Sequence, residues 1–296
     1  MEGINAYVVR DSWEAGSIYA GIIGDTNNLG HGQIDSGSFV YHNGGTIWFC
    51  DLGTENYNCY GFWNSGSTRY RYYMMNAEGN NTLFVADQDR ILPYGQALSG
   101  FGSMIETGDN KYGAYSIIDN TSAYSTLANY AYRGMLLTND RRTLVIQDEV
   151  EFVNPQNAYW VGHTQQEVYL SVDGTVAYMY DGKSVIRVTI VDRTDSGLRF
   201  ELEDCYTYHL TASEGMDELA EENYLLGTHE RNKDRSGYRK LAIAINNAKS
   251  VRLAIVIEEM SVGEITELGY EWQDMADWDN STQAKTERFQ KAHCLI

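Results

Sequence analysis

The sequence is poor in basic residues and in proline, and it lacks long apolar runs. Of 296 residues, 22 are lysine or arginine against 41 aspartate or glutamate, which gives a formal net charge of −19. Such a charge repels phosphate backbones and anionic lipid, so we expect no nucleic-acid partner and no membrane partner. No run of about 18 apolar residues occurs, and residues 1–11 show no classical export signal. The cellular location stays open.

Cysteine is also scarce. Cys50, Cys59, Cys205 and Cys294 show neither a CxxC pair nor another close spacing of the kind that holds a metal. Disulfide frameworks are typical of smaller secreted chains that are dense in cysteine. We therefore expect free thiols, either buried or at the surface.

The two prolines contrast with 28 glycines. Glycine suits tight turns between strands, whereas proline is excluded from central ladders. Turns such as Asn43-Gly44-Gly45 and Asp181-Gly182 separate short runs rich in β-branched and aromatic residues. These runs predict strands from end to end, at residues 6–10, 38–42, 46–50, 82–86, 142–148, 167–172, 176–180, 184–191, 198–202, 240–245 and 251–257.

Helical periodicity is confined to residues 213–224 and, more weakly, 274–292. A chain of many antiparallel strands and few helices must bury one face of each sheet against another. We therefore predict an all-β fold, a large antiparallel β-sandwich with one or two short helices. Residues 1–270 are expected to form this one domain, and residues 271–296 a polar tail or a packing helix.

The densest polar and aromatic region, residues 30–94, contains the candidate ligand contacts. Aromatic rings can stack on the flat faces of sugars, and guanidinium groups bind carboxylate or sulfate groups in bidentate fashion. On this chemistry we name Tyr57, Trp63, Arg69, Arg71 and Tyr73 as candidate sugar contacts. The alternative for each aromatic residue is an ordinary place in the core or at the rim of a sheet.

Several segments together resemble the C-terminal domain of the heparinase II/III-like polysaccharide lyases. The resemblance extends from about residue 6 to residue 257, and no single short motif decides it. It rests on the order and spacing of Ser12-Trp13, the His-Gly-Gln-Ile-Asp-x-Gly-Ser-Phe segment at 31–39, Asp51-Leu52-Gly53 with Tyr57, and the segments 77–83, 144–149 and 159–164.

The resemblance implies a β-sandwich that packs against an N-terminal α/α toroid, a domain that this sequence does not contain. It implies β-elimination on a polysaccharide that contains uronic acid, with His31 in proton transfer. The partners it implies are an anionic polysaccharide and a toroid domain or subunit on another chain. His163 lies at a family-like position and is a further candidate sugar contact, with a structural role as the alternative. A non-catalytic carbohydrate-binding or subunit-assembly sandwich is the alternative function.

Relatives often carry a zinc-type site whose positions correspond here to Gln33, Asp51 and Asn80. Both histidines of that site are replaced by amides, and Zn²⁺ prefers nitrogen and sulfur ligands. Two interpretations remain: a metal-free cluster of hydrogen bonds, or a site for a harder cation such as Ca²⁺. No cofactor is certain, and Ca²⁺ is favoured over Zn²⁺.

Overall fold

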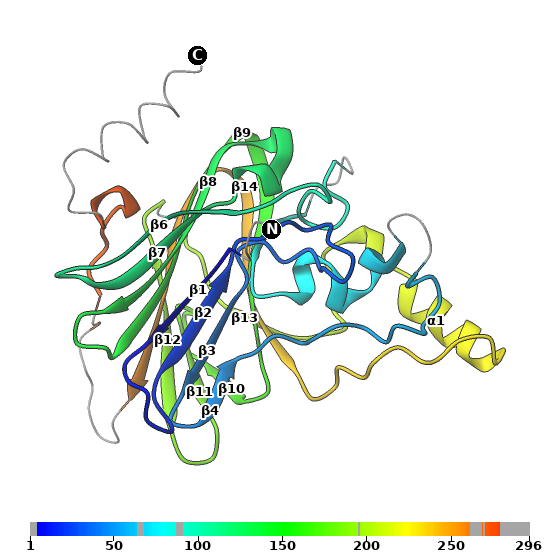
Figure 1. The fold of residues 1–296 in the computed structure, drawn as a ribbon, viewed down its shortest axis with the longest axis horizontal. Helices are drawn as coiled ribbons and strands as arrows, with labels where there is room; N and C mark the ends of the chain where they lie inside the picture. Colours follow the sequence, from blue (N-terminus) through cyan, green and yellow to red (C-terminus); the bar gives the residue numbers. More distant parts are fainter. Residues whose placement is uncertain are drawn as a thin grey trace.

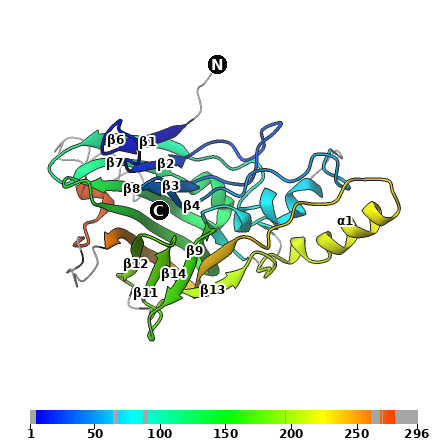
Figure 2. The same ribbon diagram turned by 90° about the horizontal axis from the view of Figure 1, so that it is seen from below.

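The computed structural model describes residues 5–63, 68–86, 91–194, 196–260, 268 and 270–278. Two antiparallel sheets form two layers, and Figure 2 shows the smaller sheet lying over the larger one. The smaller sheet has the strand order β1-β2-β3-β4. Its strands are β1 (Ala6–Arg10), β2 (Tyr19–Ile23), β3 (Phe39–Asn43) and β4 (Thr46–Phe49). The prediction of an all-β sandwich is confirmed.

The larger sheet has the order β10-β11-β12-β14-β9-β8-β7-β6, with β13 paired to β14 and β5 paired to β9. Its two central strands, β9 (Thr143–Thr164) and β14 (Arg239–Met260), lie side by side along most of their length. The other strands are β5 (Leu83–Val85), β6 (Ser103–Asp109), β7 (Gly113–Asp119), β8 (Ala128–Thr138), β10 (Glu167–Leu170), β11 (Val176–Tyr180), β12 (Val185–Asp192) and β13 (Glu201–Asp204).

The main core lies between the two sheets. Phe49 of the smaller sheet meets Trp160 of the larger sheet edge to face, with ring centroids 6.3 Å apart. Gly162 allows this contact, because a Cβ atom there would lie 2.5 Å from the Phe49 ring. Aromatic packing across the layers therefore fixes how the sheets are stacked.

The C-terminal part of the described chain covers the other face of the larger sheet. Met275 and Trp278 are buried there against Tyr115 and Val145. A Cβ atom at Gly134 would lie 2.5 Å from the Trp278 ring, so the absence of a side chain makes room for this residue. Part of the segment expected to be a tail thus packs on the sandwich, while residues 279–296 lie outside the described residues.

One α-helix occurs among the described residues, α1 (Met216–Leu225), close to the helix predicted at 213–224 (Figure 1). Of the helix predicted at 274–292, the described part is a 3₁₀ turn, Met275–Asp277. Other 3₁₀ turns are Thr68–Arg71, Tyr73–Met75, Ala77–Gly79, Thr121–Leu127 and Thr211–Ser213. No helix in the described part of the chain is long and apolar enough to cross a membrane.

Three of the four cysteines lie in the described residues, and all three are free and buried. Burial raises the pKa of the Cys50 and Cys59 thiols to about 12, so neither is a ready nucleophile. The expectation of free thiols is confirmed for Cys50, Cys59 and Cys205, and Cys294 lies outside the described residues.

Candidate functional site

The candidate site is built on the segment between β2 and β3, which carries His31. This segment has no regular structure and is held by its backbone. The amide of Ile34 donates to the carbonyl of Met75 at 3.0 Å, and the amide of Gly37 donates to the carbonyl of Ile23 at 2.7 Å. Gly37 has a φ of +85°, a conformation that favours glycine. The segment is thus fixed at its C-terminal end, and its N-terminal part reaches the surface.

His31 is exposed and lies against two aromatic rings. Its ring centroid is 5.7 Å from that of Tyr57 and 5.6 Å from that of Trp63, whose own centroids are 5.2 Å apart. Phe62 packs behind both rings at about 5 Å. We call His31, Tyr57 and Trp63 the surface ring cluster. Three residues predicted separately for the site therefore lie together on the surface.

A cavity of about 530 Å³ adjoins this cluster. Tyr57, Phe62 and Trp63 form one part of its lining, and the loop after α1 contributes Thr228, His229 and Glu230. The amides of Asn56 and Asn58 hold the Glu230 carboxylate at 2.9 and 3.1 Å. The lining combines ring faces with polar groups, which suits a hydroxyl-rich ligand.

Arg69 and Arg71 make contacts that the sequence did not reveal. Arg69 donates to the carbonyls of Leu29 and Gly30, both at 2.8 Å, and so holds the chain directly before His31. Arg71 donates to the carbonyl of Ala212 at 2.8 Å and to that of Glu214 at 3.3 Å. Much of each guanidinium group is therefore used to position backbone segments.

Tyr73 and His163 are closed off from solvent, at 1% and 0% exposed, so the structure contradicts their prediction as sugar contacts. The Tyr73 hydroxyl lies 2.9 Å from Nε2 of His163, and Oδ1 of Asn81 lies 3.0 Å from Nδ1. Because the Asn81 oxygen can only accept, Nδ1 carries the proton and Nε2 accepts from Tyr73. Burial, with a smaller contribution from Lys240, lowers the pKa of His163 to about 3.

A pair of buried charges lies next to these residues. Lys240 donates to Glu78 and to the carbonyl of Thr207, both at 2.8 Å, and Nζ lies 5.6 Å from the centre of the Tyr73 ring. Lys240 and Glu78 are both fully buried. We call Tyr73, His163, Lys240 and Glu78 the buried polar network. Sequence reasoning missed the last two, although a lysine that opens the apolar run 240–245 is a signal of a buried partner.

A second buried ion pair connects the larger sheet to the His31 segment. Arg133 of β8 binds Asp148 of β9 through two hydrogen bonds of 2.7 and 2.9 Å. Its remaining donors reach the carbonyls of Gly37, at 2.9 Å, and Asn81, at 3.0 Å. The bidentate pair thus anchors the segment that carries His31 to two strands of the sheet.

The positions of the zinc-type site lie close to Asp35. Burial raises the pKa of Asp35 to about 6, with further contributions from the charges of Asp51 and then Asp25. Oε1 of Gln33 and Oδ1 of Asn80 are buried and have no hydrogen-bond partner among the described residues. Asn80 donates instead to the carbonyls of Asn76 at 2.9 Å and Ile34 at 3.5 Å.

These groups offer oxygen ligands and no imidazole or thiolate. No group of three or more His, Cys, Asp or Glu side chains able to hold a metal was found in the described part of the chain. The two unpaired amide oxygens and the carboxylates of Asp35 and Asp51 are nevertheless ligand types that suit a hard cation better than Zn²⁺. Sequence reasoning missed Asp35, whose signal was its place four residues after His31.

Comparisons with known proteins agree with this architecture. The family model described as "Heparinase II/III-like, C-terminal" matches residues 17–251, which is most of the chain. The chain belongs to this family. None of the curated proteins searched matches this heparinase II/III-like domain.

Solved structures share its fold. A crystal structure of heparinase III matches with a TM-score of 0.61 and 17% identity, over 86% of this chain and 35% of that chain. Heparan sulfate lyase HepC from Pedobacter heparinus matches with a TM-score of 0.64 and 12% identity, over 89% of this chain and 36% of that one. The domain therefore spans about a third of the length of these structures.

Proposed function

We propose that this heparinase II/III-like domain takes part in β-elimination on a polysaccharide that contains uronic acid, with His31 in proton transfer. A base removes the proton at C5 of the uronate, and the electron pair left behind forms the C4–C5 double bond. The C4–O4 bond breaks, and an acid protonates the departing oxygen. The observation that carries the proposal is an exposed imidazole in contact with both Tyr57 and Trp63, with ring centroids less than 6 Å apart.

The ring cluster supports this proposal because it combines a proton-transfer group with a stacking surface. Trp63 is 56% exposed and Tyr57 is 37% exposed, so a sugar can reach both rings. The His31 ring is exposed, so a substrate can reach its nitrogens, unlike those of the fully buried His163. The adjoining cavity of about 530 Å³ provides room for a neighbouring sugar unit.

Elimination also requires that the uronate carboxylate be neutralised, because only then does the C5 proton become acidic. Arg69 and Arg71, the arginines closest in sequence to the ring cluster, are largely occupied by backbone carbonyls. This supports the proposal that full activity needs another domain or subunit. In the resemblance described above, that partner is the α/α toroid.

The test is formation of an unsaturated product. The chain is mixed with heparan sulfate, alginate, hyaluronan and chondroitin, and the ultraviolet absorbance of the new double bond is followed. We expect His31→Ala to lower the rate by about 10²–10⁴-fold, the usual contribution of a positioned acid or base. His42→Ala, which removes a half-buried histidine in β3, is the matched control and should retain activity. Activity that survives His31→Ala would show that the assignment of His31 is wrong.

The alternative is a sandwich that binds carbohydrate without cleaving it. The occupied arginines favour it for the isolated chain, since no free guanidinium is evident beside His31 in the described region. Measurable glycan binding with no product from any of the four polymers would support this alternative.

We also propose that Asp35, Asp51, Gln33 and Asn80 form a site for Ca²⁺. The support is the pair of buried amide oxygens without partners and the raised pKa of Asp35, which a bound cation would relieve. The cation would hold the segment after His31 to the loops that carry Asp51 and Asn80. Thermal unfolding with and without a chelator tests this site.

A further inference from the structure

A gap interrupts the larger sheet on one side of β14. On this side β14 pairs with β13 from Arg239 to Ala242 and with β12 from Leu253 to Met260. Between these ladders, within the described residues, the backbone of 243–251 has no strand partner on this edge, since the carbonyl of Arg252 still accepts from the amide of Arg193 at 2.9 Å. β14 is also irregular here, with register shifts on its β9 side and a φ of +50° at Asn247. Backbone donors and acceptors are thus left at an open edge.

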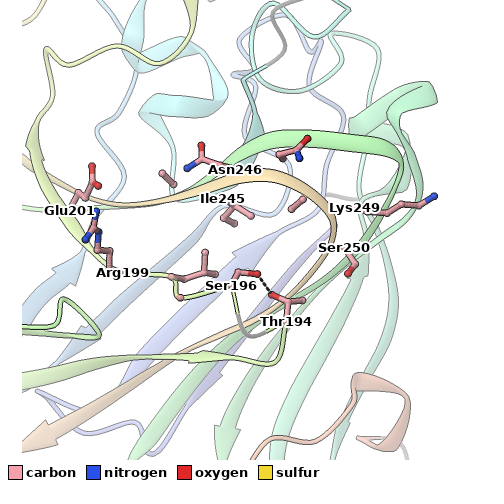
Figure 3. A pocket seen from close by; sticks show the side chains of 13 residues that line it. Thr194, Ser196, Arg199, Glu201, Ile245, Asn246, Lys249 and Ser250 are labelled. Carbon is pink, nitrogen blue, oxygen red and sulfur yellow. Dashed lines mark hydrogen bonds between the residues drawn. The ribbon is translucent and has the colours of Figure 1, made fainter.

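A cavity of about 600 Å³ fills this gap. Its lining is largely polar and comes from Thr194, residues 196–199 and Glu201 on one side and from residues 244–250 on the other. In Figure 3, Thr194 and Ser196 lie in the middle, joined by a hydrogen bond of 2.8 Å between their hydroxyl groups. Arg199 and Glu201 lie together at one end, and Ser250 lies near the other. The site presents hydroxyl, amide and oppositely charged groups side by side.

A second cavity, of about 300 Å³, shares Asn246 with the first. Its lining includes Tyr159 and His209, whose rings are stacked at 4.0 Å with an angle of 15° between their planes. Phe84 stacks on Tyr159 at 5.6 Å, so three rings form a continuous pile. The two cavities thus share Asn246, and the second one adds the rings of Tyr159 and His209 to the lining. We call them together the β14 groove.

We propose that the β14 groove binds an oligosaccharide chain, through sugar units that carry no more than one charge. Hydroxyl groups both donate and accept hydrogen bonds, as do the Ser, Thr and Asn side chains of the groove. Glu201 beside Arg199 disfavours a densely sulfated unit, because two like charges would then meet. Lys249 does not offset this, since Nζ turns away to the carbonyl of Val153 at 3.4 Å.

The groove is distinct from the proposed catalytic site. None of the residues that line its two cavities belongs to the surface ring cluster or to the cavity beside it. A groove of this kind would hold a long polymer while His31 acts on another part of it. Binding in the groove does not depend on the lyase function, so the two proposals can fail separately.

The experiment measures binding of tetrasaccharides from hyaluronan, alginate and unsulfated heparan by calorimetry. His31→Ala protein is used so that the probe is not consumed. Asn246 and Arg199 are both exposed, and both are replaced by alanine in this background. The loss of their hydrogen bonds, one of them from a charged group, should weaken binding of at least one probe by roughly tenfold or more. Ser250→Trp, which fills the cavity without removing these groups, should have the same effect.

Asn139→Ala with Arg142→Ala is the matched control, because it removes the same side-chain types from an exposed turn between β8 and β9. Its affinity should stay at the parent value. The proposal is overturned if no probe binds, or if binding persists unchanged in the groove variants. Groove-dependent binding without product formation in the wild type would uphold the groove and show that the chain alone does not cleave these polymers.

Discussion

Among the histidines of this domain that lie beside tyrosine rings, His31 and His163 are in opposite environments. His31 is exposed and contacts Tyr57 and Trp63, in a segment without regular structure. His163 is fully buried on β9, with one ring nitrogen bonded to Asn81 and the other to Tyr73. The same pair of residue types thus forms a solvent-facing cluster in one place and part of the core in the other.

Burial decides what each pair can do. Loss of solvation lowers the pKa of His163 to about 3, so this ring stays neutral and serves as a hydrogen-bonding spacer. His31 is exposed at the surface, so its ring is available to a substrate. We therefore expect changes in the buried polar network to affect folding, and changes in the surface ring cluster to affect ligands.

The largest effect on folding is expected from Lys240→Met. The substitution leaves the buried Glu78 without its cation, and Glu203 loses the same partner. Removing one member of a buried ion pair costs about 3–5 kcal/mol in the free energy of unfolding. Urea unfolding followed by circular dichroism measures this loss.

The matched control is Lys249→Met, on the same strand but exposed, which should change stability by no more than about 0.5 kcal/mol. The double variant Lys240→Met with Glu78→Gln should recover part of the loss, because the uncompensated charge is removed. Equal stability of the two lysine variants would contradict the view that the network is structural.

A smaller effect is expected from pH. His163 has a folded pKa of about 3 against an ordinary value of 6.5, so the unfolded chain binds an extra proton between these values. Stability should therefore fall as the pH drops below 6.5, by up to about 1.4 kcal/mol per pH unit from this group. His163→Gln should flatten the decline in a series of urea titrations at different pH.

Asp35 should act in the opposite direction. Its folded pKa of about 6 lies above the ordinary 3.8, so the folded chain holds the extra proton and its contribution to stability grows as the pH falls from 6 towards 4. Asp35→Asn should therefore steepen the acid-induced decline that His163→Gln flattens. Identical pH profiles for the two variants would break the contrast between the regions.

The fold was predictable where the strand signal is local. Alternating and β-branched runs located β1, β3, β4 and β10–β12, and glycine turns marked their hairpins. The strands β2, β6, β7 and β8 were missed. Small residues such as Gly134 and Ala131 interrupt the strand pattern in β8. They are explained by tertiary contacts, since Trp278 packs over Gly134. The length of β9 and β14 likewise depends on their mutual pairing.

The candidate site was predictable in part. His31, Tyr57 and Trp63 were predicted as candidate site residues from the sequence, and their rings are in contact in the structure. The sequence could not show that Tyr73 is buried while Tyr57 is exposed, because both lie in one aromatic stretch without a clear period. Nor could it show the partners of Arg69, which are backbone carbonyls and leave no trace in the side-chain pattern.

The smallest effect is expected from Ca²⁺, and it sharpens the contrast because the proposed cation site involves the segment after His31 and not His163. With about 1 mM Ca²⁺ and a dissociation constant of about 10⁻⁴–10⁻³ M, binding should add about 0.4–1.4 kcal/mol to stability. Thermal unfolding with and without a chelator measures this gain. Asp51→Asn should abolish it, and Zn²⁺ should not reproduce it.

Calcium should also change the pH profile. A cation beside Asp35 favours the ionised carboxylate, so the stabilisation that this residue contributes below pH 6 should disappear when Ca²⁺ is bound. The decline due to His163 should remain, since that ring lies in the buried polar network. A Ca²⁺ effect that persists in Asp51→Asn, or one that alters the His163-dependent slope instead, would place the cation elsewhere and leave the amide oxygens of Gln33 and Asn80 unexplained.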